Sequence, residues 1–133
     1  MCATYYARTS DHGYETCAEH LAMAGCLAGG FAKGFGYLDD GLLAGLVHDL
    51  GKYSDAFQRR IRNPDHCGPV DHSTAGALLL MRHVCPLAAM AVAGHHAGLP
   101  DLGSYGELEG STFMSRMNRA RRAGDCNPLA LAQ

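Results

Sequence analysis

An apolar helical segment that ends in an adjacent histidine and aspartate constrains the fold of this chain most. The segment reads DDGLLAGLVHDLG over residues 39–51, and its two leading acids suit the positive end of a helix dipole. His48 and Asp49 close the apolar run, where burying an imidazole and a carboxylate is costly unless both find partners. The fold must therefore bring compensating groups to this helix end from elsewhere in the chain.

Five further helical segments each have a capping or turn residue near one end. They cover about residues 17–35, 55–62, 71–84, 86–96 and 111–123. A T-x-x-E capping box from Thr16 to Glu19 starts the first, Ser54 caps the second, and Pro86 takes the first turn of the fourth. Glycines inside these segments indicate close helix packing. No stretch alternates with a strand period, so the sequence predicts an all-α fold, a single helical domain over residues 1–133.

Composition excludes several classes of protein. The chain has 133 residues and is 47% hydrophobic, which suits one folded domain. Its formal charge of −2 excludes a uniformly basic coat for nucleic acid but allows local basic patches. No run approaches the roughly 18 apolar residues of a membrane span. The start of the chain lacks a secretory signal and no C-x-x-C pair occurs, so we expect a reduced, cytoplasmic protein.

Histidines are concentrated where helical segments begin or end. Five of the eight lie at such places or beside a carboxylate, namely His20, His48, His72, His95 and His96. An isolated histidine is usually structural, and we interpret His12, His66 and His83 in that way. Neutral imidazole is the commonest ligand for transition metals. The clusters HD, DHS and HH therefore predict a metal site between helix ends.

The adjacent pair His48–Asp49 suits two ions better than one. Neighbouring side chains on a helix diverge by about 100°, so the two cannot face one small ion from the same side. The two side chains need not face the same ion if the Asp49 carboxylate bridges two ions and the His48 imidazole binds one of them. The pair alone is weak support for such a site, and the other clusters strengthen it.

Five motifs follow one another in a specific order: YYA, ETCAEHLAMAG, AGLVHDLGKYSDAFQRRI, VDHSTAGA and AGHHAGLPD. Together they resemble the HD nuclease domain of type I CRISPR–Cas systems, which is fused to the interference helicase or acts beside it. The resemblance covers about residues 5–101, whereas residues 102–133 diverge or are truncated. It implies an all-helical HD domain that binds two divalent transition metals and cuts single-stranded DNA as an antiviral endonuclease.

The resemblance also implies a role for each residue of the motifs. Asp49 would bridge two ions and act in catalysis, together with Lys52. A three-ligand group would consist of His20, His48 and Asp49, and a four-ligand group of Asp49, His72, His95 and His96. Histidine-rich ligation favours Mn, Fe, Co or Ni over Mg. Two such ions can activate a water and stabilise the attacking and leaving oxygens.

The last helical segment departs from the family pattern. Relatives carry a late metal-binding aspartate after an apolar run, whereas this chain reads NRARRAGD and places Asp125 near that position. Arg8 also stands where relatives often have histidine. We therefore predict a well-filled four-ligand group and a weak or empty three-ligand group.

Several cationic and acidic residues have two open interpretations. Lys52 could meet a scissile phosphate or lie solvated at a helix end. Asp71 could orient His72 or cap the following helix. Two arginine pairs with i,i+3 spacing could follow a DNA backbone or form ordinary helix surface, and they are Arg59 with Arg62 and Arg116 with Arg119.

The sequence is compatible with three functions. The first is a nuclease whose partners would be single-stranded DNA, the CRISPR interference helicase and the surveillance complex. The second is an HD phosphohydrolase that acts on small nucleotides. The third is a truncated, catalytically impaired HD domain that serves as an interaction module.

Overall fold

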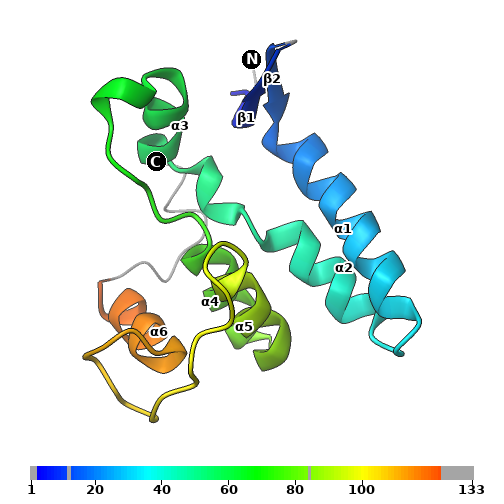
Figure 1. Cartoon of the computed structure of the whole chain (residues 1–133), viewed down its shortest axis with the longest axis vertical. Coiled ribbons are helices and arrows are strands. Elements are labelled where there is room, and N and C mark those ends of the chain that lie inside the picture. The colour runs from blue at the N-terminus through cyan, green and yellow to red at the C-terminus, as the bar shows by residue number, and fades with distance from the viewer. Residues whose placement is uncertain (1–2, 12, 84, 124–133) are drawn as a thin grey trace.

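The computed structural model describes residues 3–11, 13–83 and 85–123, and these are mostly helical (Figure 1). Within these ranges, six α-helices and two short 3₁₀ segments are accompanied by one two-stranded sheet. The all-α prediction is confirmed. The four cysteines within these ranges are free thiols. None of the described helices combines the length and the apolar character that crossing a membrane requires.

Helices α1 (Cys17–Lys33) and α2 (Leu38–Val47) form an antiparallel pair (Figure 1). The predicted capping box at Thr16 is present and starts α1. Glycines allow the two backbones to approach closely. A Cβ added to Gly45 would lie 2.5 Å from the carbonyl oxygen of Ala24, and one added to Gly41 would lie 2.6 Å from that of Ala28. Gly41 and Gly45 thus serve close packing, as predicted, whereas a Cβ at Gly30 of α1 would meet nothing within 4 Å.

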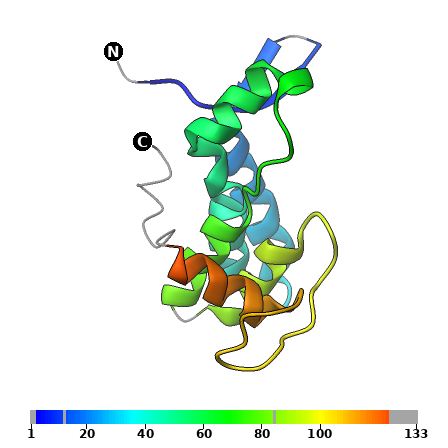
Figure 2. The ribbon, with the colours of Figure 1, turned by 90° about the vertical axis from the view of Figure 1, so that its left-hand side faces the viewer.

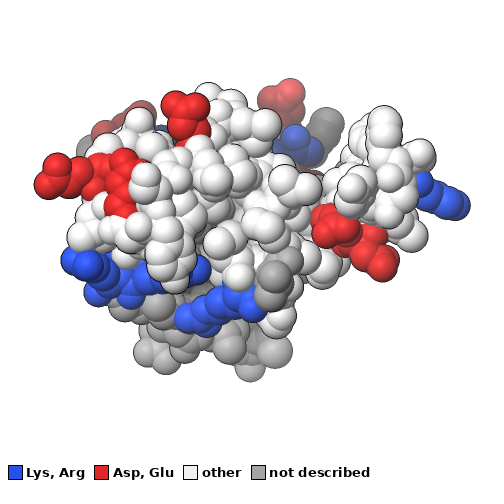
Figure 3. Space-filling model, turned by 90° about the horizontal axis from the view of Figure 1, so that it is seen from below, with Lys and Arg blue, Asp and Glu red and all other residues white. Residues whose placement is uncertain are grey.

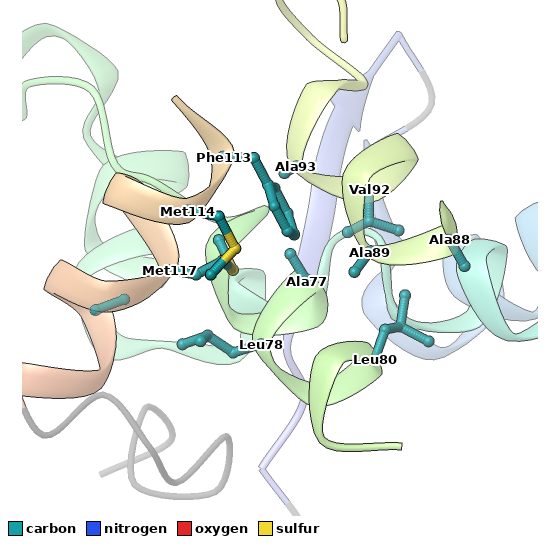
Figure 4. Packing of buried hydrophobic residues seen from close by; sticks show 11 residues of the cluster. Ala77, Leu78, Leu80, Ala88, Ala89, Val92, Ala93, Phe113, Met114 and Met117 are labelled. Carbon is teal, nitrogen blue, oxygen red and sulfur yellow. The ribbon is translucent and has the colours of Figure 1, made fainter. Parts of the chain in front are cut away.

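The main core lies between α4 (Thr74–Arg82), α5 (Pro86–Gly94) and α6 (Phe113–Arg122). Figure 4 shows Phe113 and Met117 of α6 lying against the small and branched side chains of the other two helices. Both are almost fully buried, at 1% and 0% exposure. Ala44 and Val47 of α2 pack against the same cluster. The core therefore joins the helices whose ends carry the predicted metal ligands.

Helix α2 ends earlier than the sequence predicted. It stops at Val47, and a 3₁₀ segment, η1 (Leu50–Tyr53), follows before α3 (Asp55–Arg62) and the short η2 (Pro64–His66). The amide of Gly51 donates to the carbonyl of His72 at 3.0 Å, which ties η1 to the segment before α4. This tertiary hydrogen bond favours the tighter turn over continued α-helix.

The absence of strands was a wrong prediction. Strands β1 (Tyr6–Ser10) and β2 (Gly13–Thr16) form an antiparallel hairpin that leads into the N-terminus of α1, at the top of both views, whereas α6 lies near the bottom (Figures 1 and 2). They are too short and too exposed to show a period of two. Buried Gln58 of α3 secures the hairpin, because its side chain accepts from the amide of Tyr6 at 3.1 Å and donates to the Tyr6 carbonyl at 2.8 Å.

Helix α4 starts three residues later than predicted, because Asp71 caps it. Asp71 accepts hydrogen bonds from the amides of Ser73 and Thr74, both at 3.1 Å. His72 instead donates its Nδ1–H to the carbonyl of Val70 at 3.0 Å. Of the two interpretations of Asp71, the structure shows the cap.

Candidate metal centre

The five predicted histidines meet around one buried carboxylate. Asp49 is 3% exposed. Its Oδ2 lies 3.1 Å from Nε2 of both His20 and His48. Its Oδ1 lies 3.4 Å from Nε2 of His72 and 3.3 Å from Nε2 of His95. His96 completes the cluster, since its Nε2 lies 2.7 Å from that of His72.

The ligands come from separate segments of the fold. His20 lies in the second turn of α1, His48 and Asp49 follow the end of α2, and His72 precedes α4. His95 and His96 follow the end of α5. Each segment is held by the packing described above, so the side chains are positioned before any ligand binds.

The expected divergence of His48 and Asp49 is wrong. It assumed that both residues lie inside a continuous helix. Because α2 ends at Val47 and Asp49 takes φ −110° and ψ 26°, the backbone turns there and both side chains face the same centre. The pair can therefore share one ion as well as bridge two.

Backbone carbonyls orient three of the rings. Nδ1 of His48 lies 2.8 Å from the Gly45 carbonyl, and Nδ1 of His95 lies 2.7 Å from the Val92 carbonyl. His72 makes the matching contact to Val70. A carbonyl only accepts, so each Nδ1 carries the proton, and in the neutral ring Nε2 then presents its lone pair. With neutral rings, three Nε2 lone pairs would point at a carboxylate, an arrangement that needs protons or a cation between them.

A cluster of this kind needs positive charge. Asp49 Oδ1 is buried, and the Nε2 atoms of His72 and His95 lie 3.4 and 3.3 Å from it. Burial raises the pKa of Asp49, but hydrogen bonds from His48, His95 and Lys52 outweigh it and hold the pKa well below the usual range. The centre is therefore an ionised carboxylate that depends on neighbouring positive charge.

Protons on the rings supply only part of this charge. The hydrogen bond to Asp49 raises the pKa of His95, against the effect of burial. The pKa of His96 is lowered by burial and then by the charges of His95 and His72. The surroundings thus favour a proton on His95 and disfavour one on His96. A metal ion bound at the Nε2 atoms compensates the lone pairs and the carboxylate at once.

Two groups of ligand atoms could each hold an ion, and they share Asp49. They are the four-ligand and three-ligand groups predicted from the sequence, and within each the ligand atoms lie within 4.8 Å of one another. The donor set fits a divalent transition metal. The unequal filling of the two groups stays a prediction, and the late carboxylate Asp125 lies outside the described residues.

Lys52 points into the centre. Its Nζ lies 2.6 Å from Asp49 Oδ2, and its side chain is only 12% exposed. The 3₁₀ turn places it there, since the amide of Lys52 donates to the carbonyl of Asp49. It is therefore not a solvated surface lysine. A contact between Lys52 and phosphate stays a prediction.

Glu15 is a site residue that the sequence did not reveal. Its Oε2 lies 3.3 Å from Nδ1 of His20 and accepts a hydrogen bond from Nε of Arg8. His20 thus has a carboxylate where His48, His72 and His95 have carbonyls. The unpredicted hairpin brings Glu15 to this position, and the only sequence signal is an acid five residues before a candidate ligand.

We expect Glu15→Leu to weaken metal binding at the three-ligand group by about 10–100-fold, because outer partners fix the ring orientation of a ligand. Glu15→Gln should have a smaller effect, since its amide oxygen still accepts. Calorimetric titration with Mn²⁺ measures both. Asp11→Asn, an exposed acid in the same hairpin, is the control. Unchanged binding in Glu15→Leu would show that His20 does not need this partner.

The predicted nucleic-acid arginines have different surroundings. Arg59 and Arg62 are exposed on α3, and Arg62 lies over the ring of Tyr6 at 5.6 Å. Arg119 donates to the carbonyls of Leu108 and Gly110. The guanidinium of Arg116 is engaged inside the chain. Figure 3 shows basic and acidic side chains interspersed on the face that it presents. DNA contact by these arginines stays a prediction.

The fold and the centre together define a class: a mostly helical chain with a histidine–aspartate cluster fit for divalent metal. Comparison of the chain with protein-family models and with curated proteins finds no match.

Proposed function

We propose that this chain is a metal-dependent phosphodiesterase of the HD nuclease type that cuts single-stranded DNA in CRISPR interference. The observation that carries the proposal is the set of histidine Nε2 atoms around the buried carboxylate of Asp49, which the two ligand groups share. The order of the HD, DHS and HH motifs, which resembles that family, supports the same assignment. Its partners would be the interference helicase and the surveillance complex.

The chain supplies a set of positioned ligands and one largely buried cation, Lys52. When bound, a pair of divalent ions activates water and offsets charge on a phosphodiester. Asp49 would bridge the two ligand groups through its two oxygens. Four of the five histidine rings contact Glu15 or a backbone carbonyl through Nδ1, which pre-organises the centre. Lys52, which pairs with Asp49, can turn its ammonium toward a phosphate oxygen as a point charge.

The proposal that the substrate is single-stranded DNA rests on the exposure of the centre and on the arginines of α3. The histidine side chains facing Asp49 are between 18% and 23% exposed, so the centre can be reached from solvent. Arg59 and Arg62 lie on α3, directly after the 3₁₀ turn that carries Lys52. Exposed arginines beside a metal centre can contact the phosphates of a flexible strand.

The deciding experiment incubates Mn²⁺- or Co²⁺-loaded protein with single-stranded DNA, duplex DNA and a panel of nucleotides. We expect cleavage of single-stranded DNA that stops when the metal is chelated. The protein carrying Arg59→Glu and Arg62→Glu should bind single-stranded DNA more weakly and with a shallower salt dependence. Hydrolysis of nucleotides without DNA cleavage would indicate the small-nucleotide phosphohydrolase. Tight metal binding with neither activity would indicate an interaction module.

A further inference from the structure

Arg116 of α6 joins the two segments that supply the histidines of the four-ligand group. Its Nε donates to Oγ1 of Thr74 at 2.6 Å, at the start of α4. Its Nη1 donates to the carbonyl of Ala93 at 2.7 Å, near the end of α5. Thr74 lies two residues after His72, and Ala93 lies two residues before His95. One guanidinium therefore links both ligand-bearing segments.

The third nitrogen of Arg116 strengthens the contact at the α4 end. Nη2 donates to Oγ of Ser73 at 2.7 Å and to both carboxylate oxygens of Asp71, at 2.9 and 3.1 Å. Asp71 in turn caps α4. Arg116 thus binds the residues on both sides of His72, in the planar fork geometry that lysine lacks.

The hydrophobic core holds Arg116 in place. Phe113 and Met117, on either side of Arg116 in α6, are almost fully buried, and Thr112 caps the helix. The Ala93 carbonyl belongs to the last turn of α5, where carbonyls lack partners within the helix. Helix ends fray most readily. Arg116, which is held by α6, donates a hydrogen bond to the Ala93 carbonyl at the end of α5. The separation of His72 and His96, whose Nε2 atoms lie 2.7 Å apart, depends on these two ends.

We propose that Arg116 is a positioning residue for the four-ligand group, holding His72 in register with His95 and His96 without touching the ion. The proposal rests on the metal centre and not on the reaction assigned to it. It also explains why α6, which carries no described metal ligand, packs across the start of α4 and the end of α5.

Zn²⁺ titration followed by the NMR signals of the histidine rings tests this inference, because each ring reports its own binding. In Arg116→Met, we expect the affinity read from His72, His95 and His96 to fall by about 10–100-fold. The affinity read from His20 and His48 should change less than about twofold. Arg116→Lys should lie between, since it keeps the charge beside Asp71 but not the link to α5. Arg122→Met, an exposed arginine at the end of the same helix, is the control.

Amide hydrogen exchange of the metal-free protein gives an independent measurement. Arg116→Met should lose protection at the start of α4 and the end of α5 while α1 and α2 keep theirs. Should Arg116→Met not fold, Thr74→Val removes one acceptor with little change in shape and should show a smaller loss at the same places.

The outcomes separate the two proposals. A wild-type protein that binds no Zn²⁺ at any ring would overturn the metal centre. Wild-type affinity at His72, His95 and His96 in Arg116→Met would overturn the role of Arg116 while leaving the centre intact. Loss of protection throughout the chain, with equal loss at all five rings, would show that Arg116 only stabilises the fold.

Discussion

Replacing Asp49 by asparagine should abolish tight metal binding at both ligand groups. Asp49 is the only carboxylate in either group, and each of its oxygens faces a different set of histidines. Asparagine keeps the size of the side chain but replaces one oxygen with an amide donor and removes the charge. We expect the affinity for Mn²⁺ to fall by more than about 100-fold, beyond the range seen when only outer partners are lost. Metal analysis after dialysis and calorimetric titration measure the effect.

The same variant separates metal binding from folding. Helices α4, α5 and α6 do not depend on Asp49 for their core, so Asp49→Asn should keep the helical content measured by circular dichroism. The control is Asp65→Asn, which removes an exposed acid from η2. Asp65→Asn should bind metal like the wild type. Two tightly held ions in Asp49→Asn would contradict the bridging role.

Gly76→Ala should destabilise the chain strongly. A Cβ at Gly76 would lie 1.9 Å from the carbonyl oxygen of Val47, which is backbone and cannot turn aside. Helix α4 would have to move away from the end of α2. We expect the free energy of unfolding, measured by urea denaturation, to fall by about 3 kcal/mol. Metal binding should weaken as well, because His48 follows Val47 directly.

Gly30→Ala is the matched control. Gly30 also lies inside a helix, but a Cβ there would meet no atom within 4 Å. Alanine is preferred over glycine in a helix, so we expect a gain in stability of about 0.5–1 kcal/mol. If the two alanine variants were equally stable, the close contact between α4 and α2 would be wrong.

Local signals predicted the helix starts well. Thr16, Ser54 and Thr112 accept hydrogen bonds from amides in the first turns of α1, α3 and α6, and such bonds depend on neighbours in the sequence. The candidate ligands could be predicted for a related reason. Their residue types are unusual at the ends of apolar helices, and their order along the chain resembles a known family.

Features that depend on distant residues could not be predicted in this way. The early end of α2 depends on the hydrogen bond between Gly51 and His72. The hairpin is secured by Gln58, more than forty residues away. From its i,i+3 spacing, Arg116 is predicted to follow a DNA backbone or to form ordinary helix surface, but its partners lie on α4 and α5. Each case is a tertiary contact between segments that are far apart in the sequence, and local sequence patterns do not indicate which distant segments will meet.

The origin of the ligands in four helical regions couples the ion to the whole chain. At least one ligand is lost when any of these regions unfolds locally: α1, α2, the start of α4 or the end of α5. An ion that binds only the intact centre therefore stabilises each of them against unfolding. At a free ion concentration 100 times the dissociation constant, this linkage adds about 2.7 kcal/mol to the free energy of unfolding. The supply of metal in a cell would then govern how long a folded molecule survives proteolysis, in addition to any effect on catalysis.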